Sequence, residues 1–145
     1  MKRCICGLLM MLTAAVFVAG CGQSGPERIP TYPVVGRLLV DGEPAEMVAV
    51  HCVRLSEADK ENPTESQCFT AADGSFTIGT YESMDGVPEG EYALTFQWGE
   101  WNLFSHSYSG DKLNGRYSDP AKSDVKFEVV PGERKDLKTI ELTTK

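Results

Sequence analysis

The sequence predicts an all-β protein, a β-sandwich of about seven strands in a single domain. Three observations predict it: short runs in which apolar and polar residues alternate, turn dipeptides between these runs, and almost no window with the 3.6-residue period of an amphipathic helix. Short strands separated by turns in this number are typical of a sandwich. The runs span residues 34–40, 46–54, 66–70, 75–80, 91–98, 124–130 and 137–143.

The alternation within the runs predicts which side chains face the core, because successive residues of a strand point to opposite faces. His51 is therefore expected to point outward and its neighbour Cys52 inward. The predicted inward-facing sets are Tyr92, Leu94, Phe96 and Trp98, then Val125, Phe127 and Val129, and then Val48, Val50 and Cys52.

Three turn dipeptides separate the strands: Asp41-Gly42, Asp73-Gly74 and Pro131-Gly132. Glycine takes a positive φ in such turns, and aspartate bonds its own backbone. The Asp-Gly pairs could also be taken for calcium ligands, but neither lies in the D-x-D-x-D-G run of a calcium loop. We therefore predict turns and no metal site.

The first twenty residues, "MKRCICGLLMMLTAAVFVAG", predict a secretory signal peptide. Lys2 and Arg3 precede a weakly apolar run that ends on small residues. A membrane-spanning helix would need about 20 strongly apolar residues, whereas this run is shorter and contains Gly7 and Thr13. We therefore expect residues 1–20 to be removed from the folded protein.

The junction that follows, "VAGC" at residues 18–21, resembles the lipobox of bacterial lipoproteins. The resemblance implies that Cys21 carries a diacylglyceryl lipid, with fatty chains such as palmitate, and anchors the protein in the cell envelope. One acyl chain holds a protein only marginally, so stable attachment needs two or more. Gly22 in place of an aspartate favours the outer membrane in lipoproteins of this kind. The alternative is an ordinary secretory cleavage site with a chance cysteine.

Residues 21–32 are rich in Gly, Pro and polar side chains, which predicts a lipidated N-terminus followed by a flexible tether. Residues 33–145 then form the domain, with one core. Residues 1–20 contain two of the 14 Lys and Arg and none of the 21 Asp and Glu, so the remaining chain has a net charge of −9. This charge argues against nucleic acid and anionic lipid headgroups as partners.

Two cysteines remain in the domain, Cys52 and Cys68, because Cys4 and Cys6 leave with the signal peptide and Cys21 carries the lipid. In an oxidising compartment we predict that Cys52 and Cys68 form a disulfide. Closing the loop between them would contribute about 3 kcal/mol in the chain-entropy model. The alternative is a pair of free thiols, since a disulfide needs adjacent strands in the right register.

Three motifs occur in order along residues 33–143, after a first strand that contains Gly36. They are a D-G-x-P turn (Asp41, Gly42, Pro44), a D-G-x-F turn (Asp73, Gly74, Phe76) and a P-x-G-x-Y element (Pro88, Gly90, Tyr92). Together they resemble the carboxypeptidase regulatory-like, transthyretin-like domains. The P-x-G-x-Y element is the most specific of the three.

This resemblance implies a Greek-key β-sandwich in which Tyr92 has a structural role, with its ring in the core and its hydroxyl available to the turn backbone. It implies no catalytic residue. Modules of this family accompany catalytic domains or occur in envelope proteins, and their structural relatives include carbohydrate-binding domains. Fold alone does not assign a function.

Residues 99–123 are more than a tight hairpin needs, and they hold the candidate binding residues. Aromatic side chains in such a loop could stack on sugar rings or anchor a protein partner. Alternatively, they fold back as a lid over an edge or end of the sandwich. The candidate ligand-binding residues are Trp101, Phe104 and Tyr108, with Asp111 and Asn114 as hydrogen-bonding neighbours, whereas Trp98 is expected in the core.

Catalysis has little support in the sequence. His51 and His106 are the only histidines, and a zinc site would need carboxylates from several loops. A hydrolase centred on His106 could use a neighbouring serine, but the sequence contains no G-x-S-x-G elbow and no nucleotide-binding glycine loop. We therefore predict no enzyme activity, no cofactor and no metal.

The sequence thus predicts a non-catalytic, lipid-anchored envelope protein that acts as a structural or interaction module. Its expected partners are the membrane, through the N-terminal lipid, and an envelope protein or a glycan. The main alternative function is carbohydrate binding through the aromatic residues of the 99–123 segment.

Overall fold

A computed structural model describes residues 28–56 and 65–145 of the chain. The predicted signal peptide, Cys21 and the first residues of the predicted tether lie outside the described residues. Within the described ranges, no helix is long and apolar enough to cross a membrane.

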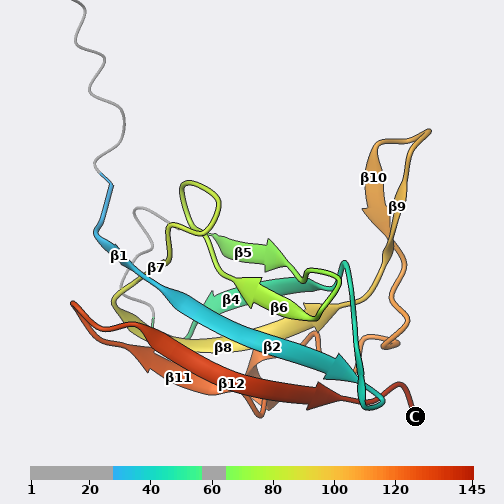
Figure 1. Ribbon diagram of the computed structural model, residues 1–145. Coiled ribbons are helices and arrows are strands. Elements are labelled where there is room, and N and C mark those ends of the chain that lie inside the picture. The colour runs from blue at the N-terminus through green and yellow to red at the C-terminus, as the bar shows by residue number, and fades with distance from the viewer. Residues whose placement is uncertain (1–27, 57–64) are drawn as a thin grey trace, which may run out of the picture.

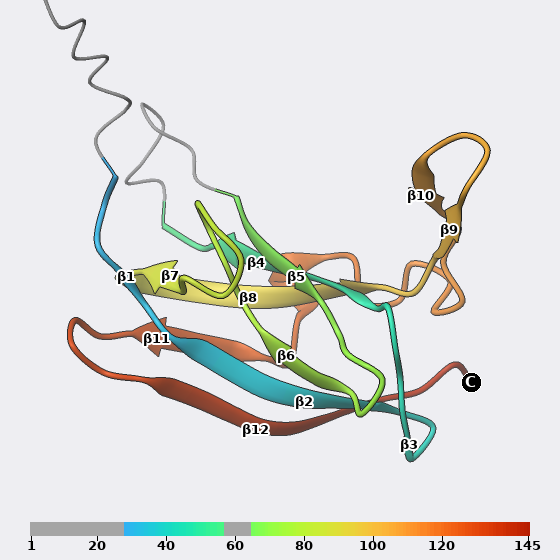
Figure 2. The ribbon, with the colours of Figure 1, turned by 45° about the horizontal axis from the view of Figure 1, so that its top comes forward.

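Two β-sheets pack face to face around one core (Figures 1 and 2). Their main strands are β2 (Val34–Val40), β4 (Ala49–Arg54), β5 (Ser66–Phe69), β6 (Ser75–Thr77), β8 (Gly90–Gln97), β11 (Lys126–Val129) and β12 (Lys135–Leu142). The first sheet has the order β11–β8–β4–β5 and is antiparallel throughout. In the second sheet, β2 pairs in parallel with β12 and antiparallel with β6. The chain changes sheet between β2 and β4, between β5 and β6, between β6 and β8, and between β11 and β12, which gives the sandwich its Greek-key topology.

The remaining elements are short and lie around the sandwich. They are β1 (Thr31–Tyr32), paired with β7 (Val87–Pro88); β3 (Glu43–Pro44), paired with the end of β2; β9 (Glu100–Asn102), paired with β10 (Ser107–Ser109); and the 3-10 turn η2 (Pro120–Lys122).

Each predicted strand range overlaps one of the main strands, which confirms the all-β prediction. The differences are at strand ends. β4 begins at Ala49, later than predicted, because Met47 has a φ of 59° that interrupts the extended backbone. β12 begins earlier than predicted, at Lys135, and its register against β2 shifts around Lys138, where φ is 60°.

The core lies between the sheets and contains the side chains that the alternation places inward. Tyr92 and Leu94 of β8 are only 2% and 1% exposed. The buried residues of this core all lie between Val34 and Leu142. The chain from residue 22 onward therefore contains the whole core, and we expect it to fold without the residues before it.

The D-G-x-F motif is explained by the contact between Gly36 and Phe76, which are paired across β2 and β6. A Cβ atom on Gly36 would lie 2.5 Å from the Phe76 ring, so only glycine lets the buried ring lie over the strand. In the turn before it, the carboxylate of Asp73 accepts hydrogen bonds from the backbone N–H and hydroxyl of Ser75, at 2.9 and 2.6 Å. Gly74 has the positive φ that the motif predicts, 79°.

The D-G-x-P motif forms the turn between β2 and β3. Asp41 and Gly42 have φ values of 52° and 86°. The Asp41 carboxylate accepts hydrogen bonds from the hydroxyls of Thr144 at 2.6 Å and Thr143 at 2.9 Å. These bonds lower the pKa of Asp41 and tie the C-terminal residues to the turn.

The P-x-G-x-Y motif places Tyr92 in the core. Its ring stacks on Phe127 with a centroid distance of 6.0 Å, and Pro88 is buried beside it in β7. The Tyr92 hydroxyl accepts a hydrogen bond from Nε of Arg54 at 3.2 Å, and Arg54 also donates to the carbonyl of Glu89. The expected link between the hydroxyl and the turn backbone therefore runs through Arg54.

The predicted disulfide is absent from the described residues, because Cys52 and Cys68 are free thiols. The register of β4 and β5 pairs Cys68 with Val50 and Cys52 with Ser66. The two cysteines are thus diagonal neighbours, about 7–8 Å apart, beyond the about 4.4–6.8 Å between the Cα atoms of a disulfide. Burial raises the pKa of both thiols, that of Cys68 to about 12.

Candidate binding site

Residues 99–123 begin with a β-hairpin, β9–β10, that continues from the end of β8. Its register places Trp101 opposite Tyr108 and Asn102 opposite Ser107. Figures 1 and 2 both show the hairpin standing away from the two sheets. Its strands are three residues each, too short for an alternating pattern to reveal them, so the sequence predicted only a long loop.

The hairpin tip (residues 103–106) is held by local hydrogen bonds. Oδ1 of Asn102 accepts from the backbone N–H groups of Phe104 at 2.9 Å and Ser105 at 3.1 Å. His106 has a φ of 49°, which completes the turn. Phe104 is 98% exposed and Leu103 75% exposed, so the tip presents two large apolar side chains to solvent.

The base of the hairpin is fixed to the sandwich by Tyr108. Its hydroxyl donates to the carbonyl of Met47 at 2.7 Å and accepts from the backbone N–H of Gly99 at 2.6 Å. Its ring meets Phe69 of β5 edge-on, with a centroid distance of 5.1 Å. Tyr108 therefore folds back onto the sandwich, as the lid interpretation predicts, and acts as the anchor of the hairpin.

Gly99 lets the backbone of Ser109 and Gly110 approach the chain closely between β8 and β9. A Cβ atom at this position would lie 2.7 Å from the carbonyl oxygen of Ser109 and 2.9 Å from that of Gly110. Trp98, one residue earlier, packs against the edge of the core, and its Nε1 donates to the carbonyl of Glu46 at 3.2 Å.

A recess of about 640 Å³ lies beside the hairpin. Its lining includes three aromatic side chains, Trp98, Trp101 and Phe104, together with Asp111 and Lys112. The recess therefore unites three of the five predicted ligand-binding residues, whereas Tyr108 and Asn114 do not line it.

Charged groups surround the recess. Nζ of Lys112 lies 3.0 Å from a carboxylate oxygen of Glu100 and 4.9 Å from the centroid of the Trp98 ring. Trp101 is 49% exposed. The recess thus offers exposed aromatic faces beside an ion pair, a combination of stacking and hydrogen-bonding groups that suits a polar ligand with apolar faces.

Asp111 organises the turn that follows the hairpin. One carboxylate oxygen accepts from the backbone N–H groups of Trp98 and Leu113, both at 2.9 Å, and the other accepts from that of Gly115 at 2.7 Å. Partial burial raises the pKa of Asp111, but these three hydrogen bonds outweigh it and hold the pKa below its ordinary value. Asn114, with a φ of 55°, is exposed within the same turn.

The two histidines lie far apart in the fold. His106 is exposed at the hairpin tip, and His51 is half-buried in β4, paired with Thr95. In the part of the chain that the structure describes, no cluster of three or more His, Cys, Asp or Glu could hold a metal ion. None of the hydrogen bonds or ion pairs of the described residues joins a carboxylate to His106.

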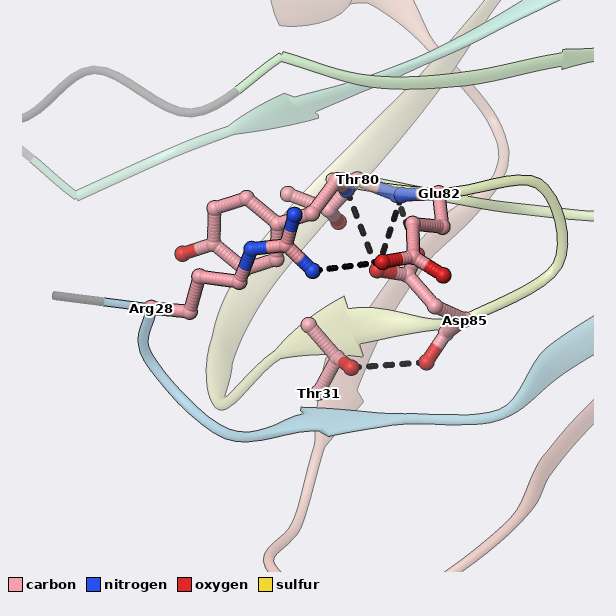
Figure 3. A network of polar contacts seen from close by, with 6 residues as sticks. Arg28, Thr31, Thr80, Glu82 and Asp85 are labelled. Carbon is pink, nitrogen blue, oxygen red and sulfur yellow. Dashed lines mark hydrogen bonds and ion pairs between the residues drawn. The ribbon is translucent and has the colours of Figure 1, made fainter. Parts of the chain in front are cut away.

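At the opposite end of β8, a polar network fixes the segment by which the chain enters the domain (Figure 3). The carboxylate of Asp85 accepts from the backbone N–H groups of Thr80, Tyr81 and Glu82, at 2.7, 3.1 and 3.0 Å. The hydroxyl of Thr31 in β1 donates to the carbonyl of Asp85 at 2.7 Å. The network therefore joins β1 to the loop before β7.

Arg28 extends this connection. Its guanidinium forms an ion pair with Glu82 at 2.6 Å and lies 5.5 Å from the centroid of the Tyr81 ring (Figure 3). The Tyr81 hydroxyl accepts from the backbone N–H of Ile29 at 3.1 Å. The first described residues are thus bound to the sandwich.

Comparison with known proteins gives similarity to solved structures only. No family model matches the chain, and no curated protein matches it. The similar structures include a 5-hydroxyisourate hydrolase from Klebsiella pneumoniae, with 20% identity and a TM-score of 0.41 over 79% of this chain and 91% of that one. A DUF3823 family protein from Parabacteroides merdae has 15% identity and a TM-score of 0.40 over 80% of this chain and 46% of that one. At these values the β-sandwich assignment rests on the sheet pairing of the chain itself, and no activity is transferred.

Proposed function

We propose that this protein is a non-catalytic interaction module of the cell envelope, attached to the outer membrane by lipid on Cys21. The observation that carries the proposal is the β9–β10 hairpin, which presents Trp101, Leu103 and Phe104 at 49%, 75% and 98% exposure. Isolated exposed apolar residues are common on proteins, but contiguous exposed apolar side chains mark interaction sites. The ion pair of Arg28 with Glu82 and the hydrogen bond from Thr31 to Asp85 bind the first described residues to the sandwich, so a lipid on Cys21 would hold the domain close to the membrane.

Metabolic labelling tests the attachment. Cells expressing the wild-type chain or a Cys21→Ala variant are grown with labelled palmitate, and the purified proteins are compared. We expect label only on the wild type and only in its membrane fraction. Equal labelling of both proteins would refute the lipid attachment, and a Cys68→Ala variant controls for labelling at another thiol.

Carbohydrate binding is the second candidate function. The recess supports it, because Trp98, Trp101 and Phe104 line it beside the ion pair of Lys112 and Glu100. Aromatic faces can stack on sugar rings, and charged groups can bond their hydroxyls. In this interpretation Lys112 would be a hydrogen-bond donor and Trp101 the stacking platform.

A glycan array with the chain from residue 22 tests this candidate. Binding to a defined glycan should be lost in Trp101→Ala and kept in Val130→Ala, which removes an exposed apolar side chain between β11 and β12. A profile that does not change in Trp101→Ala would exclude the recess as a glycan site.

A further inference from the structure

We infer that the hairpin tip inserts into the surface of the bilayer that carries the protein, so that the domain contacts the membrane at a second point besides its lipid. The inference rests on the proposed lipid attachment for one step, the closeness of the domain to a membrane. The tip therefore contacts the interfacial region of a lipid bilayer.

The exposure of the tip is the first reason. Leu103 and Phe104 occur next to each other at the furthest point of a projecting hairpin, and no other described apolar side chain is as exposed as Phe104, at 98%. Trp101 follows at the level of β9, closer to the sandwich, with 49% exposure. Leucine and phenylalanine at the end with tryptophan behind them match the order from the hydrocarbon to the headgroup region of a bilayer.

Charge is the second reason. Residues 101–109, "WNLFSHSYS", contain no Asp, Glu, Lys or Arg, although these residues make up 24% of the chain. Inserting a charged side chain into a bilayer is costly, so a stretch without Asp, Glu, Lys or Arg lowers the cost of insertion. A protein partner of such an acidic chain is expected to form ion pairs with some of its carboxylates. The tip has no carboxylate.

The hydrogen bonding of the tip is the third reason. Backbone groups that enter a bilayer must be satisfied within the protein. Asn102 already accepts from Phe104 and Ser105, and the hydroxyls of Ser105 and Ser107 lie 2.7 Å apart and bond each other. The apolar side chains can therefore leave water while the turn keeps its local bonds.

The position of the tip is the fourth reason. Figures 1 and 2 show the hairpin and the first described residues at opposite ends of β8, both leaving the sandwich towards the same side. Six residues lie between Cys21 and Arg28, and the seven steps from one to the other, at about 3.3–3.6 Å each, span at most about 25 Å. A domain tethered this closely can lie along the bilayer with β8 roughly parallel to it and the tip in contact.

Vesicles with a chemical tether test the inference without the natural lipid. The chain from residue 21 is coupled through the thiol of Cys21 to a maleimide lipid in vesicles of phosphatidylcholine and phosphatidylethanolamine, some of which contain brominated acyl chains. Bromine quenches tryptophan that lies at the bilayer, and all proteins carry Trp98→Phe so that Trp101 is the one remaining tryptophan and the quenched fraction reports it. We expect clear quenching of the wild type and a fall of about threefold or more in a Phe104→Ser variant, because the largest buried apolar group is lost.

A Val130→Ser variant is the matched control, since it also replaces an exposed apolar side chain but lies away from the hairpin. Its quenching should equal that of the wild type. Adding anionic phosphatidylglycerol should weaken the contact, because the chain has a net charge of −9 without residues 1–20.

Two results would overturn the inference: no quenching of the tethered wild type, or equal quenching of the wild type and Phe104→Ser. A cross-linker at residue 104 that captures one defined envelope protein, with no quenching in vesicles, would assign the tip to a protein partner instead. Because the chemical tether replaces the cellular lipid, failure of the tip to insert and failure of Cys21 to be lipidated give separate results.

Discussion

The same kind of hydrogen bonding holds the chain at both ends of β8, but the two ends differ in how much apolar surface they expose. Before the strand, the carboxylate of Asp85 accepts three backbone N–H groups, and after it the carboxylate of Asp111 does the same. At the first end Val87 is fully buried and the single residue Met84 is 68% exposed, whereas the hairpin beyond the second end exposes the adjacent Leu103 and Phe104 at 75% and 98%. Local hydrogen bonds therefore order the chain at both ends, and the exposed tip belongs to an ordered hairpin. The apolar tip is thus a hydrogen-bonded part of the fold, which the proposed membrane contact requires.

The largest predicted effect comes from the strand between these ends. Tyr92→Ala should lower the free energy of unfolding by about 3–5 kcal/mol, because it removes a buried aromatic ring from the core. Phe104→Ala should change it by less than about 0.5 kcal/mol, because an exposed side chain makes few contacts to lose. Urea denaturation of the chain from residue 22 measures both. A similar loss in the two variants would mean that the tip packs on the sandwich and would contradict the comparison.

Thiol reactivity sharpens the same contrast between buried and exposed regions. With its pKa raised to about 12 by burial, Cys68 has little thiolate at pH 8, and alkylation should be slower than that of an exposed cysteine of pKa about 8.5 by on the order of a thousandfold. A cysteine introduced as Ser105→Cys should react at the rate of an exposed thiol. In urea without reductant, alkylation should modify both Cys52 and Cys68, and a protein that needs reductant first would contain the disulfide after all.

The sequence was sufficient for the sandwich and insufficient for the hairpin, and strand length explains the difference. β8 has eight residues, so its alternation between Tyr92, Leu94 and Phe96 is long enough to be recognised. β9 and β10 have three residues each, and their pairing depends on Asn102 and Tyr108 forming bonds outside the strands. No pattern of that length distinguishes a strand from a loop.

The predictions of the disulfide and of the ligand-binding residues depended on strand register and side-chain contacts, which composition does not determine. The cysteines share a face, as alternation predicts, but a register with Cys52 directly opposite Cys68 was needed for a bridge, and the observed one pairs Cys52 with Ser66. Tyr108 and Trp101 are both aromatic residues of one hairpin. The contacts of Tyr108 with Met47, Gly99 and Phe69 distinguish this anchor from the exposed Trp101.

Tyr108→Phe should loosen the hairpin without unfolding the sandwich. The variant keeps the ring contact with Phe69 but leaves the carbonyl of Met47 and the N–H of Gly99 without their partner. The expected cost is about 1–2 kcal/mol, confined to the hairpin. Hydrogen exchange should become faster in residues 99–110 and stay unchanged in β8. Tyr117→Phe is the control, because it also removes a tyrosine hydroxyl that accepts from a backbone N–H, that of Thr143 at 3.0 Å, outside the hairpin. Faster exchange throughout the sheet would show that the hairpin and the sandwich unfold together.

The smallest effect concerns the pH dependence contributed by Asp111. Because hydrogen bonds hold its folded pKa below the ordinary value, its contribution to stability is complete above the unfolded pKa of about 3.9 and is lost as the pH falls through the folded pKa. The contribution should stay below about 1 kcal/mol, since solvent screens this partly exposed group. Asp111→Asn removes the titration, so the stability difference between wild type and variant should shrink between pH 5 and about pH 2. Urea midpoints across this range measure the difference, and a constant difference for Asp111→Asn would mean that its three hydrogen bonds do not depend on charge.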